Sequence, residues 1–165
     1  MTIIMQQLED RLEYKERSKR YLEKAKNTKE YIVDIAKDFF AEQKIEKQND
    51  EKVNEIYSKI TYLEDSITRD ISKSIIYSLK ALEISTGMQD VFFIKNDDTM
   101  ISLIYQFIIE QPEKLKNKII NNIKYDIKIS NILCKIISLR KTLKTNNLEL
   151  FDGYTEFANL IPLNC

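Results

Sequence analysis

The chain has 165 residues, 43% of them hydrophobic, and its 26 basic residues balance its 26 acidic residues. This length and apolar content suit one domain with a buried core and exclude wholesale disorder. The balanced charge favours no particular partner. The abundance of Ile, Lys and Asn is typical of phages, large DNA viruses and low-GC bacteria.

Missing residue types exclude several kinds of catalytic centre. Because the chain has no His, it cannot form a Ser-His-Asp triad, a Cys-His pair or a His-containing zinc site. The only glycines are Gly87 and Gly153, too few and too far apart for a glycine-rich phosphate loop. We therefore predict that the protein is not an enzyme and needs no cofactor.

The two cysteines, Cys134 and Cys165, are too few for an all-cysteine zinc site, and a disulfide framework is not expected. Cys134 lies in an apolar stretch and is expected to be a small core residue, whereas Cys165 ends the chain as a mobile thiol. The apolar start at residues 1–5 is too short for a signal peptide, and no stretch is long enough to span a membrane. We expect a cytoplasmic protein, in the host cytoplasm if it is viral, with no membrane partner.

The first half of the chain predicts a long antiparallel helical hairpin at residues 2–86. This range contains no Gly or Pro, and apolar residues recur in it at helical spacing. The turn is expected at residues 48–51, and Gly87 is expected to end the second helix in a left-handed conformation. In the first helix the apolar stripe is interrupted, because its heptad register places Lys15, Lys19, Lys26 and Lys29 on the seam.

The second half predicts a smaller helical bundle. Residues 87–99 are expected to be a connector, in which the run Val91–Ile94 is favoured as a packed linker over a short strand. Residues 100–165 then form helices: a buried one from 100 to 111, and a longer one from Pro112, with a kink, a break or burial on two sides near Ser130–Asn131. The last segment is expected to dock through three aromatic residues, Phe151, Tyr154 and Phe157. The fold class is therefore all-α, one helical domain over residues 1–165.

Basic residues concentrate in one part of the second half. All nine bases of residues 113–165 lie between Lys114 and Lys144, an interval whose only acid is Asp126. A lysine-rich helix of this kind can neutralise phosphates without reading base sequence. The alternative is a solvated face. The candidate nucleic-acid contacts are Lys114, Lys118, Lys124, Lys128, Lys135, Arg140, Lys141 and Lys144.

The apolar residues that the hairpin cannot cover by itself suggest a protein interface. Helical hairpins with such surplus apolar surface tend to oligomerise or to bind other helices, although these residues would serve equally well in a core. The candidates are Leu8, Leu12, Leu22, Phe39, Phe40, Phe92 and Phe93. They favour a non-enzymatic interaction protein, such as an adaptor, an inhibitor or an assembly subunit, with self-association as a homodimer expected. Low-specificity RNA or DNA binding through the lysine-rich helix is the alternative.

Carboxylates at helical spacing, such as Glu13 and Glu16 or Asp34 and Asp38, could in principle hold a magnesium ion. Lysines and arginines alternate with them along the helix, so ion pairs on a solvated face are the expected arrangement. No motif in the sequence identifies a family.

Overall fold

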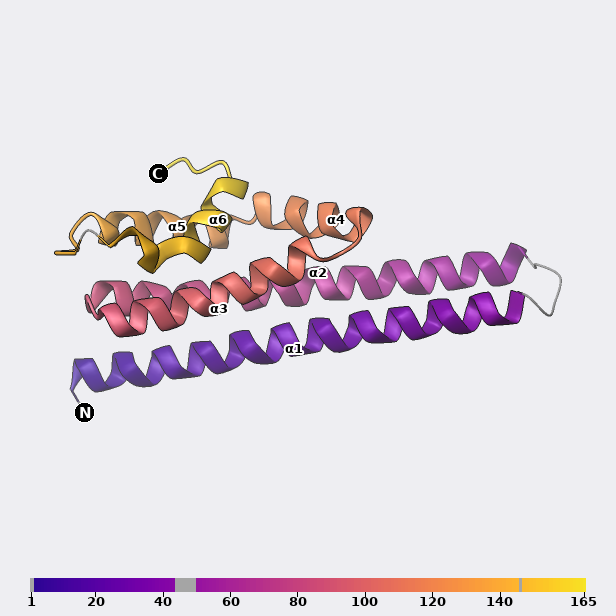
Figure 1. The fold of residues 1–165 in the computed structure, drawn as a ribbon, viewed down its shortest axis with the longest axis horizontal. Coiled ribbons are helices and arrows are strands. Elements are labelled where there is room, and N and C mark those ends of the chain that lie inside the picture. Colours follow the sequence, from indigo (N-terminus) through magenta and orange to yellow (C-terminus); the bar gives the residue numbers. More distant parts are fainter. Residues whose placement is uncertain (1, 44–49, 146) are drawn as a thin grey trace.

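The computed structural model describes residues 2–43, 50–145 and 147–165, and these ranges are helical, with no strand. The predicted all-α fold is confirmed. Helix α1 (Ile3–Gln43) and helix α2 (Asp50–Gly87) lie antiparallel along the long axis of the molecule (Figure 1). Of the turn predicted at 48–51, residues 48 and 49 lie outside the described residues, whereas Asp50 and Glu51 belong to α2, so the prediction is wrong for these two.

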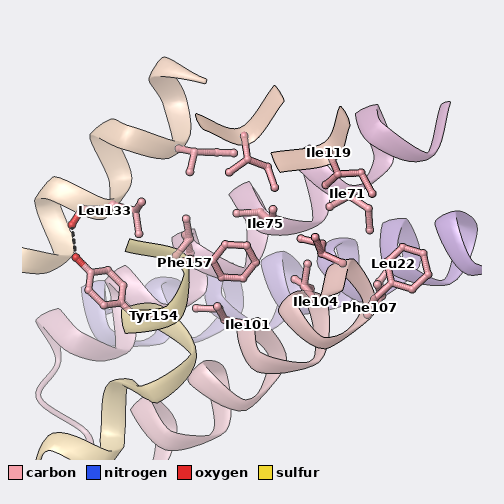
Figure 2. Packing of buried hydrophobic residues seen from close by; sticks show 14 of the residues in the cluster. Leu22, Ile71, Ile75, Ile101, Ile104, Phe107, Ile119, Leu133, Tyr154 and Phe157 are labelled. Atoms are coloured by element: carbon pink, nitrogen blue, oxygen red, sulfur yellow. Dashed lines mark hydrogen bonds between the residues drawn. The ribbon is translucent and has the colours of Figure 1, made fainter. Parts of the chain in front are cut away.

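Helix α2 is the central element, because it contacts α1, α3, α4 and α5. Its stripe of Ile67, Ile71, Ile75 and Leu79 is completely buried. Figure 2 shows Ile71 and Ile75 among side chains from α1, α3, α4, α5 and α6. The smaller helices that pack on this stripe are α3 (Val91–Ile109), α4 (Glu113–Lys124), α5 (Ile127–Arg140), the 3₁₀ helix η1 (Leu148–Phe151) and α6 (Asp152–Leu160).

The side of α1 that packs on α2 differs from the predicted apolar stripe. Its buried positions are Arg11, Ser18, Leu22, Ala25 and Ile32. Ser18 and Ala25 each lie one residue before a predicted seam position, Lys19 and Lys26, so the buried heptad repeat is offset by one residue from the predicted one. Two of these positions are polar and have partners. The Ser18 hydroxyl donates to the carbonyl of Ser74 at 2.7 Å, and the Ser74 hydroxyl donates to the carbonyl of Ser18 at 2.8 Å. These reciprocal hydrogen bonds join α1 to α2 at polar positions, which a search for apolar periodicity does not detect.

The connector predicted at 87–99 is wrong for most of its length, because α3 begins at Val91. Asp90 caps this helix: its carboxylate accepts a hydrogen bond from Phe93 N at 3.0 Å. The left-handed residue after α2 is Gln89, with φ 56°, and not Gly87, which is the last residue of α2. The run Val91–Ile94 is therefore the first turn of a helix that continues to Ile109.

The break predicted near Ser130–Asn131 lies five residues earlier, at Tyr125–Asp126. The Asp126 carboxylate accepts from Lys128 N at 2.9 Å and from Ile129 N at 3.2 Å, which starts α5. The chain changes direction here, and the two helices bury separate stripes. The stripe of α4 is Leu115, Ile119 and Ile123. The α5 stripe is Ile129, Ile132, Leu133 and Ile136.

The C-terminal segment docks as predicted, with Phe151, Tyr154 and Phe157 all at most 3% exposed. The Tyr154 hydroxyl donates to the carbonyl of Leu133 at 2.8 Å (Figure 2). The expectations for the cysteines are wrong, because Cys134 is half-buried and forms a disulfide with Cys165. The C-terminal segment brings Cys165 to Cys134 of α5. The two residues are 31 positions apart in the sequence, and that separation alone does not predict the pairing.

Candidate functional site

The structure separates the predicted protein-interface residues into three places. Leu22 is a core residue, only 5% exposed. Phe39 and Phe40 lie in the last turns of α1, where the hairpin extends past the other helices (Figure 1). The remaining four lie near the N-terminal ends of two helices: Leu8 and Leu12 on α1, and Phe92 and Phe93 on α3.

A buried ion pair fixes α1 against α3 at this place. The Arg11 guanidinium donates two hydrogen bonds to the Asp97 carboxylate, both at 2.7 Å, and both side chains are at most 5% exposed. Lys15 Nζ lies 3.2 Å from the same carboxylate and also donates to Asn96. The Arg11 guanidinium covers the Phe93 ring at 4.1 Å. Since Leu8 and Leu12 share one helical side with Arg11 and Lys15, that side of α1 faces α3.

Large apolar side chains remain exposed on both sides of this contact. Leu12 is 59% exposed on α1, and Phe92 is 75% exposed on α3. Leu103 lies three turns after Phe92, on the same side of α3. We call this set the α1/α3 surface; its members are Met5, Leu8, Leu12, Phe92, Phe93 and Leu103. Such a group of exposed apolar side chains on a rigid support is a feature of binding surfaces.

The eight predicted nucleic-acid contacts do not form one continuous ridge, because the helix that would carry them breaks at Tyr125–Asp126. Lys118 lies 2.5 Å from the Asp65 carboxylate of α2, and Arg140 covers the ring of Phe151 at 4.4 Å. Lys128 lies at the start of α5, beside α2. The others are exposed at separate positions of α4, α5 and the segment after it: Lys114, Lys124, Lys135, Lys141 and Lys144.

A second cluster, which sequence reasoning missed, combines tyrosines with basic residues. Tyr77 of α2 lies between two tyrosines of α1, with ring centroids 5.9 Å from Tyr14 and 6.0 Å from Tyr21. The ammonium group of Lys73 lies 5.3 Å from the Tyr21 ring, and that of Lys80 lies 5.4 Å from the Tyr14 ring. The heptad spacing of Tyr14 and Tyr21 was the available signal, because it places both rings on one side of α1.

Arg17 completes this cluster. Its guanidinium lies 5.4 Å from the Tyr77 ring and donates a long hydrogen bond of 3.5 Å to the Tyr77 hydroxyl. It also pairs with Glu13 at 2.5 Å. The hydrogen bond to Tyr77 and the Glu13 carboxylate raise the pKa of Arg17.

Three adjoining hollows open beside these rings. The first holds about 260 Å³ and is lined by Arg17, Arg20, Tyr21, Lys24 and Tyr77. The second, of about 500 Å³, shares Tyr21 and Tyr77 with the first and reaches α5. The third, also of about 500 Å³, shares Lys73, Ile76 and Lys128 with the second. We call the three together the tyrosine groove; its basic residues are Arg17, Arg20, Lys24, Arg69, Lys73, Lys80 and Lys128.

Glu13 pairs with Arg17 at the α1 end of the tyrosine groove, and Asp126 and Asp70 lie nearer its other basic residues. Asp126 lines the third hollow, but its oxygen caps α5. Asp70 is 5% exposed, and burial raises its pKa, while Lys24, Lys73 and Arg69 lower it. Its Oδ2 has no hydrogen-bond partner among the residues described. The groove therefore presents basic side chains to solvent.

Asp98 of α3 is a structural carboxylate. It accepts hydrogen bonds from Gly153 N at 2.9 Å and Tyr154 N at 2.8 Å, so it caps α6 from another helix. Burial raises the pKa of Asp98 to about 6, although the same two N–H groups lower it. Burial likewise raises the pKa of Tyr154 to about 12, against the effect of Arg140.

Within residues 2–43, 50–145 and 147–165, no three acidic or cysteine side chains form a group that could hold a metal ion. Among the helices of the same ranges, none has a long enough apolar stretch to cross a membrane. Comparisons of the chain with protein-family models, with curated proteins and with solved structures give no match.

Proposed function

We propose that the protein is a non-enzymatic helical interaction module, of the adaptor, inhibitor or assembly-subunit kind, and that its partner is a second copy of its own chain. The observation that carries the proposal is the α1/α3 surface, where Leu12, next to Arg11 in α1, and Phe92, in the first turn of α3, are exposed. Large apolar side chains held on a rigid support lose little conformational entropy on binding. A two-fold dimer buries the same surface of both copies, so one such surface is sufficient.

The proposal also covers the source and the cellular compartment of the protein. The Ile-, Lys- and Asn-rich composition supports an origin in a phage, a virus or a low-GC bacterium. A cytoplasmic location, in the host if the protein is viral, would keep Cys134 and Cys165 as thiols, since that compartment is reducing. The disulfide of the structure would then form only under oxidising conditions.

Charge substitutions on the α1/α3 surface are expected to abolish self-association. Leu12→Glu or Phe92→Glu places a carboxylate in the dimer interface, which should weaken the dimer at least about 30-fold, as for a central interface residue worth ~2 kcal/mol. Both positions are exposed in the single chain, so the fold should be unaffected. Sedimentation velocity over a wide range of protein concentrations measures the effect.

Phe40→Glu is the matched control, because Phe40 is 64% exposed but lies at the other end of α1. It should dimerise like the unmodified protein. A chain that stays monomeric at every concentration, or a dimer that Phe40→Glu weakens as much as Leu12→Glu does, would contradict the proposal.

A further inference from the structure

The tyrosine groove combines positive charge with aromatic rings in one continuous surface, on residues separate from the α1/α3 surface. Consecutive hollows share residues, so the groove extends from Arg17 and Arg20 of α1, over α2, to the start of α5. Arg69 and Lys80 alone span 11 residues of α2, about 16 Å at 1.5 Å per residue. This length accommodates more than one phosphate of an extended strand.

The basic residues of the groove lie where a phosphate backbone could follow them. Lys73 and Lys128 are exposed and line both of the larger hollows, from α2 and from α5. Lysine ammonium groups bind phosphates as point charges, and each neutralised phosphate releases counterions. Binding of this kind weakens steeply as the salt concentration rises.

An exposed aromatic ring supplies a surface for bases. Tyr125, at the break between α4 and α5, is 74% exposed and lines the third hollow. Tyr21 lines the first and second hollows, but its ring already stacks on that of Tyr77, at 5°, and has the Lys73 ammonium group 5.3 Å from it. An exposed ring beside a basic surface is a feature by which proteins bind single strands, because every base can stack whatever its identity.

We infer that the tyrosine groove binds single-stranded nucleic acid, with Lys73 and Lys128 contacting phosphates and Tyr125 stacking on bases. This goes beyond the proposed self-association and uses none of its residues. It also differs from binding through a lysine-rich helix at 114–144, because of those eight basic residues only Lys128 lines the groove. A duplex keeps its bases stacked inside, where a tyrosine ring cannot stack on them, so a duplex should bind more weakly than a single strand.

Fluorescence polarisation tests the inference with labelled oligouridylate and oligothymidylate of about 12 nucleotides, within the range bound by single domains. Lys73→Glu/Lys128→Glu should weaken binding at least about tenfold and reduce its salt dependence. The control is Lys114→Glu/Lys141→Glu, which makes the same change in net charge at exposed positions outside the groove and should bind like the unmodified chain.

Tyr125 provides a test that charge alone does not affect. Tyr125→Ala should weaken binding between about 5- and 150-fold, and Tyr125→Phe should retain it. Circular dichroism of each variant checks the fold. No binding at low salt, or equal losses in the two double-lysine variants, would overturn the inference. So would full binding by Tyr125→Ala, or a preference for phosphatidylserine vesicles over both oligonucleotides.

Discussion

Replacing Asp97 with alanine is expected to lower the free energy of unfolding by about 3–5 kcal/mol, because the variant leaves the Arg11 guanidinium buried without its partner. The structure gives Arg11 no other carboxylate within ion-pair distance among the described residues, and its guanidinium also covers the Phe93 ring. Lys15 also loses a partner. Denaturant unfolding followed by circular dichroism measures the change.

Two further variants separate the ion pair from general charge effects. Arg11→Met/Asp97→Leu replaces both partners by apolar groups of similar size and should recover most of the lost stability. Glu13→Gln removes the partner of Arg17, whose side chain is 41% exposed, and should cost at most about 1 kcal/mol. A loss below about 1 kcal/mol in Asp97→Ala would show that the pair is not buried as described.

A methyl group at Gly153 is expected to destabilise the protein by about 1–3 kcal/mol, because α6 packs against α3 without space for it. A Cβ there would lie 2.5 Å from Ser102 Oγ and 2.8 Å from both the Asp98 carbonyl oxygen and Ser102 N. The last two are backbone atoms of α3 and cannot move aside by rotation. Displacing α6 would also stretch the hydrogen bonds from Gly153 N and Tyr154 N to the Asp98 carboxylate.

Gly87 provides the matched control for Gly153→Ala. A Cβ at Gly87 would meet no atom within 4 Å, and the residue is exposed at the end of α2. Gly87→Ala should therefore be neutral or raise the stability by up to about 1 kcal/mol, since alanine reduces the freedom of the unfolded chain. Equal unfolding midpoints for the two variants would contradict the described packing of α6 on α3.

The helices themselves were largely predictable from the sequence, because breakers are rare and apolar residues recur at helical spacing. The side of α1 that is buried was not, because it depends on polar residues. Arg11 and Ser18 are buried with partners on α3 and α2, and an apolar pattern ignores such positions. The start of α3 was missed because the prediction rested on the apolar run at 91–94 and did not treat the polar residue before it, Asp90, as a helix cap.

The candidate surfaces were predictable only in part. Leu12 and Phe92 were named from the sequence, but the contact between α1 and α3 depends on the fold, in which Arg11 pairs with Asp97. The tyrosine groove was not predicted, because its residues come from α1, α2 and α5 and only the fold brings them together. The Cys134–Cys165 pair likewise depends on the path of the C-terminal segment.

We propose that one helical fold carries two independent binding surfaces, one for self-association and one for single-stranded nucleic acid. The direct test measures sedimentation and oligonucleotide binding on the same three proteins: the unmodified chain, Leu12→Glu and Lys73→Glu/Lys128→Glu. We expect that Leu12→Glu loses the dimer and keeps oligonucleotide binding, while the lysine variant loses oligonucleotide binding and keeps the dimer. If either variant lost both properties, or if the unmodified chain had neither, the claim would be contradicted.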